Sequence, residues 1–218
     1  MLPFSIRSAL FLCLFFSFSG CVSFDGPAGP PTGTYAERIE TYSRLLALED
    51  GRSYEPLLTG YATASPDPWI RAKNALAIGR LKDPAASVHF PVLLRDPEPP
   101  VRRAAAFAAG LSGDRRLIRF LKTSLSDADR ETASRAAEAI AKLGGDEAVP
   151  ALLEALEVPS GPRAAAALAL FRTPEPRVLA ALLKLTADAD PEVRRAVHFA
   201  LARRPKPESL PALRSALE

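Results

Sequence analysis

The sequence is poor in the residues from which metal and disulfide sites are built. It has 218 residues but only two cysteines and two histidines. Both cysteines, Cys13 and Cys21, stand near the amino terminus, so the rest of the chain can form no disulfide of its own. His89 and His198 have no cysteine and no second histidine at ligand spacing, which argues against a zinc site. We therefore expect both histidines to be structural, with no metal and no cofactor.

Catalytic motifs are also missing. The sequence contains no Ser-His-Asp arrangement, no G-x-S-x-G elbow, no H-E-x-x-H helix, no P-loop and no glycine-rich nucleotide loop. With no catalytic residue to name, the sequence predicts that the chain is not an enzyme. Aromatic residues make up only 7% of the chain against 48% hydrophobic residues, a balance typical of helices built from alanine and leucine rather than of a β fold.

What the chain does contain is a pair of amphipathic helices, clearest between residues 127 and 158. Asp129 can cap a first helix with one apolar face, and Gly144-Gly145 can end it, because glycine adopts the left-handed conformation of a helix C-cap. A second amphipathic helix follows, with Pro150 in its first turn, where proline is tolerated. Two such short helices cannot bury their apolar faces alone, so the pair needs a neighbour on each side.

The pair recurs along the chain. One equivalent position near the start of the first helix, which we call the slot, recurs along the chain. It is filled by Ile70, Val101, Thr132, Pro162 and Val193, at spacings of 31, 31, 30 and 31 residues. Alanine stands seven residues after every slot, at Ala77, Ala108, Ala139, Ala169 and Ala200. A small residue fixed at one position lets neighbouring helices approach closely, which predicts a stacked array.

Five regular repeats are expected, at residues 65–94, 96–125, 127–156, 159–185 and 188–217. Residues 35–62 form an irregular first repeat, as expected of a cap. The fourth repeat begins with Gly161-Pro162 in place of an aspartate cap and is expected to be the least regular.

Three short segments carry a resemblance to a known family. They are Asp190-Pro191-Glu192-Val193-Arg194, Ala77-Ile78-Gly79-Arg80-Leu81 and Ala148-Val149-Pro150-Ala151-Leu152-Leu153. These segments resemble HEAT-like repeats of the phycobilisome-lyase type, over roughly residues 34–218. The resemblance implies an all-α fold, an α-solenoid of about six helix pairs that serves mainly to hold partners.

Residues 1–20 have the features of an export signal. Arg7 supplies a positive charge, and residues 8–18 form a mostly apolar run, short for a membrane span but typical of a signal peptide. The run ends in Phe18-Ser19-Gly20-Cys21, which resembles the bacterial lipobox, where cleavage precedes a cysteine that is then lipidated. A conventional signal peptide with a chance cysteine and an uncleaved anchor are the alternatives.

The lipobox resemblance implies that Cys21 carries lipid and anchors the protein in a bilayer. Residues 21–33 then form a glycine- and proline-rich linker of at most roughly 40 Å, and residues 34–218 form the solenoid. Val22 stands where an aspartate would resemble an inner-membrane retention signal. The expected location is therefore the cell envelope, at the periplasmic or outward face of the outer membrane rather than at the inner membrane.

Arginine directly follows the slot in four regular repeats, at Arg71, Arg102, Arg163 and Arg194. Acidic residues precede it, including Asp67, Asp129 and Asp190, and also Asp96, Asp127 and Asp188. The family resemblance implies an Arg–Asp ladder that ties neighbouring repeats together. A binding stripe is the alternative interpretation.

We expect the second helices to line the concave face and to carry its partner-binding charges, which are Arg119, Lys122, Glu154, Lys184 and Arg214. Without residues 1–20, which contain Arg7 and no acidic residue, 27 basic and 25 acidic residues remain. That balance argues against a nucleic-acid partner and favours a protein partner.

The predicted function is a membrane-tethered scaffold that binds a protein partner in the cell envelope. An accessory array of a larger enzyme system, for example with a prolyl isomerase, and a bilin lyase-like protein are the alternatives. At the carboxyl end, Leu210, Leu213 and Leu217 are expected to pack inward. Ala212 and Ala216 would then form a docking or self-association surface.

Overall fold

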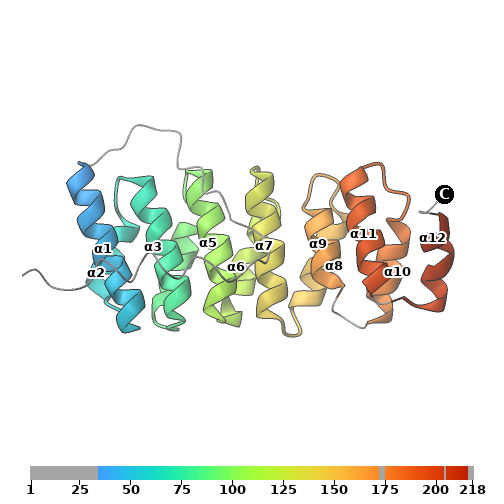
Figure 1. Ribbon diagram of the computed structural model, residues 1–218, viewed down its shortest axis with the longest axis horizontal. Coiled ribbons are helices and arrows are strands. Elements are labelled where there is room, and N and C mark those ends of the chain that lie inside the picture. The colour runs from blue at the N-terminus through green and yellow to red at the C-terminus, as the bar shows by residue number, and fades with distance from the viewer. Residues whose placement is uncertain (1–33, 172–174, 204, 216–218) are drawn as a thin grey trace, which may run out of the picture.

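The computed structural model describes residues 34–171, 175–203 and 205–215. The predictions for residues 1–33, which include the signal, Cys21 and the linker, lie outside these ranges, as do those for Ala216 and Leu217. Within the ranges the chain is helical and has no strand, and its helices stand side by side in a row (Figure 1). The predicted all-α solenoid is therefore confirmed. No helix among these residues is long and apolar enough to cross a membrane.

The helices alternate between two layers. The first helices of the pairs are α1 (Tyr35–Gly51), α3 (Pro68–Leu81), α5 (Pro99–Ser112), α7 (Arg130–Leu143), α9 (Arg163–Leu170) and α11 (Pro191–Arg203). The second helices are α2 (Pro56–Thr63), α4 (Phe90–Leu93), α6 (Ile118–Ser124), α8 (Ala148–Glu157), α10 (Pro176–Lys184) and α12 (Leu210–Ser215). Three 3-10 turns lead into α4, α6 and α12, namely η1 (Ala86–His89), η2 (Arg115–Leu117) and η3 (Pro207–Ser209).

Local sequence sets the helix ends. The Asp129 carboxylate accepts a hydrogen bond from the backbone N–H of Thr132 at the start of α7, and Asp67 caps α3 in the same way. Gly144 and Gly145 follow α7 with positive φ, which only glycine adopts without strain. The interpretation of residues 127–158 as a capped helix pair is confirmed.

Small residues bring the first helices close together. Ala77, Ala108 and Ala139 of the alanine column are buried between neighbouring first helices. Glycine allows a still closer approach: a Cβ on Gly79 would lie 2.5 Å from the backbone oxygen of Ala108, and a Cβ on Gly110 would lie 2.8 Å from the Cα of Ala139. The spacing within the first-helix layer is therefore set by backbone-to-backbone contact.

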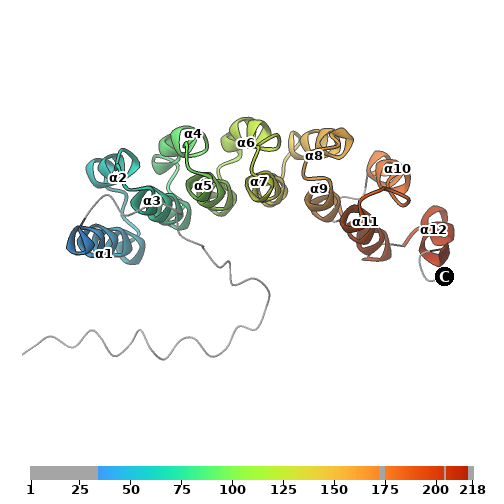
Figure 2. The ribbon, with the colours of Figure 1, turned by 90° about the horizontal axis from the view of Figure 1, so that it is seen from above.

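The second helices are more loosely spaced and contact one another sparsely. Seen from above, the first helices lie on the inside of the arc and the second helices on its outside (Figure 2). The prediction that the second helices line the concave face is therefore wrong. Alanine and glycine shorten the spacing of the first-helix layer, so the array bends toward that layer.

The two ends of the array differ. At the amino end, Leu45, Leu58 and Ile70 form a separate apolar cluster, and Trp69 closes it with its ring edge-to-face against Tyr42, at a centroid distance of 5.3 Å. This is the cap that the irregular first repeat predicts.

At the carboxyl end, Leu213 packs against the main core, but Leu210 is 46% exposed. The prediction that Leu210 packs inward is therefore wrong, since nearly half of its side chain stays open to solvent and no residue of the short helix α12 is fully buried. The fourth repeat is irregular as predicted: α9 has only 8 residues, and its Ala169 is half-buried.

Candidate functional site

The arginines that follow the slot connect each repeat to the next. Arg71 donates from Nε and Nη2 to Asp96 at 2.6 and 2.8 Å, and Arg102 donates in the same way to Asp127 at 2.7 and 2.9 Å. Arg163 pairs with Asp188. In each case the aspartate stands 25 residues after the arginine. Such forked pairs hold a fixed geometry between neighbouring repeats.

The third nitrogen of Arg71 and of Arg102 holds the turn before its own helix. Nη1 of Arg102 donates to the backbone oxygens of Asp96 and Pro97 at 2.8 and 3.0 Å, and Arg71 makes the equivalent bonds. Arg194 also makes them, to Asp188 and Ala189 at 2.6 and 3.0 Å. Within the described part of the chain, Arg194 has no carboxylate partner.

The other predicted ladder carboxylates pair with arginines that sequence reasoning did not assign to them. Asp67 pairs with Arg38. Asp129 accepts from Arg103 at 2.7 and 2.6 Å. Asp190 accepts from Arg130 at 3.0 Å, across the short fourth repeat.

These contacts lower the pKa of Asp67 and of Asp129. The Arg38 guanidinium lowers the pKa of Asp67, and the Arg103 guanidinium, with help from Thr132, lowers the pKa of Asp129. The charges of the ladder are thus largely paired within the chain, which favours a structural role over a binding stripe.

The charges predicted to bind a partner all lie on the second helices, hence on the convex side. Arg119, Lys122, Glu154, Lys184 and Arg214 are exposed. Only Lys122 and Glu154 approach each other among them, with 3.9 Å between Nζ and Oε2. The Arg119 guanidinium lies over the ring of its neighbour Phe120, at 4.5 Å. These five residues do not form one site.

A different set of side chains gathers on the concave face. Six residues after each slot, the first helices carry Leu76, Phe107, Glu138, Leu168 and Phe199. Leu168 and Phe199 are 42% and 48% exposed, and Leu76 and Phe107 are half-buried. We call these four apolar residues the concave column. Large apolar side chains that stay open to solvent in register mark a contact surface.

Cations lie over the aromatic rings of this face. The Lys142 Nζ is 4.9 Å from the centre of the Phe107 ring, and the Arg203 guanidinium is 5.7 Å from that of Phe199. Lys73 Nζ lies 5.2 and 5.3 Å from the ring centres of Tyr42 and Trp69 at the amino end. Such cation–π contacts hold the side chains in place without neutralising their charge.

These three cations form no close ion pair with a described carboxylate. Among the residues that the structure describes, Lys73, Lys142 and Arg203 have no carboxylate within 4.0 Å, whereas nearby Arg135 pairs with Glu131 at 3.5 Å and with Glu138 at 3.2 Å. Burial lowers the pKa of Lys73 and the like charge of Arg80 lowers it further, while the Glu49 carboxylate opposes this shift. A carboxylate arriving from outside would therefore be stabilised beside the concave column.

A groove of about 910 Å³ adjoins the middle of the column. It lies between α7, α8 and α9, and Val149, Leu152 and Leu168 contribute apolar walls. Glu138 and Lys142 line it as well. The groove could accept a large apolar side chain beside a charged group.

His89 lies in a polar cluster between the first two helix pairs. Its Nε2 is 3.0 Å from the Tyr54 hydroxyl and 3.2 Å from the Thr59 hydroxyl, and its Nδ1 is 3.2 Å from Thr63 Oγ1. Burial lowers the pKa of His89. In the described ranges no group of three His, Cys, Asp or Glu residues could hold a metal ion.

Sequence reasoning missed the concave column. The signal was available, since a large apolar residue stands one position before the alanine column in four of five regular repeats. Whether these residues lie on the concave or the convex face depends on which helix layer faces inward, and periodicity alone does not decide that.

Two solved structures have a similar fold. One is human deoxyhypusine hydroxylase in complex with glycerol, at 20% identity and a TM-score of 0.40, covering 87% of this chain and 86% of that one. The other is the complex of CpcE and CpcF of phycocyanin lyase from Nostoc sp. PCC7120, at 22% identity and a TM-score of 0.47, covering 86% and 84%. No curated protein matches the sequence.

Both of these structures are of enzymes, and the prediction that this chain is not an enzyme is not supported. That prediction rested on missing motifs alone, and a missing motif does not exclude catalysis. The family description "HEAT repeats" matches residues 88–170 and 162–218, which is more than half of the chain. The protein therefore belongs to the HEAT repeat family.

Proposed function

We propose that this protein is a binding scaffold whose concave face holds an acidic, amphipathic segment of a partner protein. The observation that carries the proposal is the concave column, flanked by Lys73, Lys142 and Arg203, none of which has a described carboxylate within 4.0 Å. A segment with apolar residues on one face and carboxylates beside them would cover the column and pair with the cations.

The groove beside Leu168 is the expected anchor point of that segment. Binding energy concentrates where a large side chain fills a pocket from which water is excluded, and exposed charges contribute mainly to the rate of encounter and to specificity. The groove of about 910 Å³ has apolar walls, with Lys142 on its lining. An aromatic or leucine side chain followed by a carboxylate would fit both features.

The binding site is tested by crosslinking in the cell. A photo-reactive amino acid placed at Phe107 or Leu168 should capture the partner, whereas the same residue at Arg119 or Lys184 on the convex side should not. Mass spectrometry of the captured peptide should show an acidic, amphipathic sequence. Capture from the convex positions alone, or of a basic peptide, would contradict the proposal.

Charge reversal gives a matched second test. Lys142→Glu on the concave face should weaken binding of the captured peptide by roughly tenfold, because an attraction becomes a repulsion beside the groove. Lys122→Glu on the convex face changes the net charge equally and should leave binding unaltered. Equal effects of the two variants would mean that only net charge matters.

We further propose that the scaffold is tethered in the cell envelope through lipid on Cys21, at the outer membrane, by way of the linker 21–33. The resemblance of Phe18-Ser19-Gly20-Cys21 to a lipobox supports this. Cys21→Ser should move the protein from the membrane fraction to the soluble fraction. A variant that stays with the membrane after a carbonate wash would contradict the tether.

A further inference from the structure

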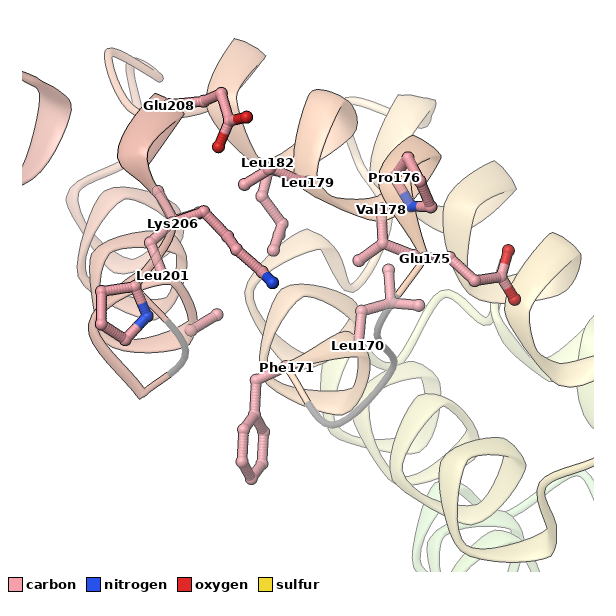
Figure 3. A pocket seen from close by; sticks show the side chains of 12 residues that line it. Leu170, Phe171, Glu175, Pro176, Val178, Leu179, Leu182, Leu201, Lys206 and Glu208 are labelled. Carbon is pink, nitrogen blue, oxygen red and sulfur yellow. The ribbon is translucent and has the colours of Figure 1, made fainter. Parts of the chain in front are cut away.

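A second cavity lies between the fifth and sixth helix pairs (Figure 3). Its volume is about 520 Å³, and residues of α9, α10, α11 and the turn η3 line it. The apolar part of its lining includes Leu170, Phe171, Val178, Leu179, Leu182 and Leu201. Cavities of a few hundred cubic ångströms with mostly apolar walls are typical of small-molecule sites.

Among the described residues that line this cavity, Lys206 is the only cation. Figure 3 shows the Lys206 side chain entering between the apolar walls, with its amine toward the middle. In the described part of the chain, no carboxylate lies within 4.0 Å of that amine. Glu175 also lines the cavity, but its carboxylate points away in Figure 3 and accepts from Arg177 Nε at 2.5 Å. Glu208 lies at the rim.

The pattern selects one kind of ligand. A neutral apolar molecule would cover Lys206 and leave its charge without a partner, which costs free energy. A phosphate or sulfate would call for more donors than a single ammonium, such as an arginine fork or several backbone N–H groups. A single negative charge on an apolar body satisfies both the walls and the lysine.

We propose that this cavity binds a small apolar carboxylate of the fatty-acid type. Its hydrocarbon part lies against Val178, Leu179 and Leu182, and its carboxylate accepts a hydrogen bond from Lys206 Nζ. None of its lining residues belongs to the concave column, although Phe171 also lines the groove beside Leu168 and its ring packs edge-to-face on Phe199.

The test is calorimetric titration of the purified full-length protein with decanoate and with decanol, which share a hydrocarbon chain and differ in charge. The unaltered protein should bind decanoate about tenfold more tightly than decanol. Lys206→Met keeps the aliphatic stem and should abolish this preference without weakening decanol. Lys184→Met, on the exposed face of α10, is the matched control and should change neither ligand.

A cavity-filling variant separates this site from nonspecific binding. Leu179→Trp adds bulk where a half-buried side chain lines the cavity, and should reduce binding of both ligands by at least tenfold while circular dichroism stays unchanged. The proposal is overturned if decanoate does not bind at millimolar concentration. It is equally overturned if Lys206→Met retains the preference for decanoate.

Discussion

Replacing Gly110 with alanine tests the feature that gives the array its curvature. Gly110 lies in α5, and a Cβ there would stand 2.8 Å from the Cα and 2.9 Å from the Cβ of Ala139 in α7. Nonbonded carbon atoms are most stable at roughly 3.5–4.0 Å. The two helices would have to separate by roughly 1 Å, since neither neighbouring atom belongs to a flexible side chain.

Two opposing terms decide how much Gly110→Ala changes the free energy of unfolding. Overpacking a well-filled interface costs about 1–3 kcal/mol, whereas glycine to alanine inside a helix gains about 1 kcal/mol of helix propensity. Gly60→Ala in α2 isolates the second term, because no heavy atom lies within 4 Å of the added Cβ. The difference between the two variants, about 1–3 kcal/mol in the free energy of unfolding, therefore reports the close approach alone.

The assay is urea denaturation of both variants and the unaltered protein, followed by circular dichroism. Gly110→Ala should be less stable than the parent and Gly60→Ala at least as stable. Gly79→Ala should be the worst of the three, because its Cβ would stand 2.5 Å from the backbone oxygen of Ala108. If all three variants were stabilised alike, the first helices would not be in backbone contact and the account of the curvature would be refuted.

Three further predictions concern the ladder, the histidine cluster and the carboxyl end. Arg102→Met should cost roughly 1.5–3 kcal/mol in urea denaturation, because Asp127 loses its forked partner, and Arg194→Met should cost less; equal losses would contradict the ladder. Burial lowers the pKa of His89, so the unfolded chain takes up the proton first and stability should fall as pH drops below about 6.5. The melting temperature of the parent should therefore be lower at pH 5.5 than at pH 7.5, and this drop should be smaller in His89→Gln. An equal drop in both proteins would exclude His89 as its source. We also propose that exposed Leu210 supports self-association: light scattering should find the parent associating and Leu210→Glu monomeric, and a parent that stays monomeric at high concentration would disprove this.

The sequence by itself determined the fold. The alanine column predicted the stacked helix pairs, and Asp129, Gly144 and Pro162 marked helix ends that the structure places at the same residues. These features are local or strictly periodic, so they can be deduced without knowing which residues meet in space. The same holds for the irregular fourth repeat and for the amino-terminal cap.

Only the tertiary structure decided which layer lies on the concave side, and with it the candidate site. Amphipathic periodicity shows that each helix has a buried face, but the direction of bending depends on the difference in spacing between two layers. That difference arises where Gly79 and Gly110 meet the backbones of the following helices. The ladder pairs show the same limit: Asp127 and Asp129 stand two residues apart, and only the packed helices assign them to Arg102 and Arg103 respectively.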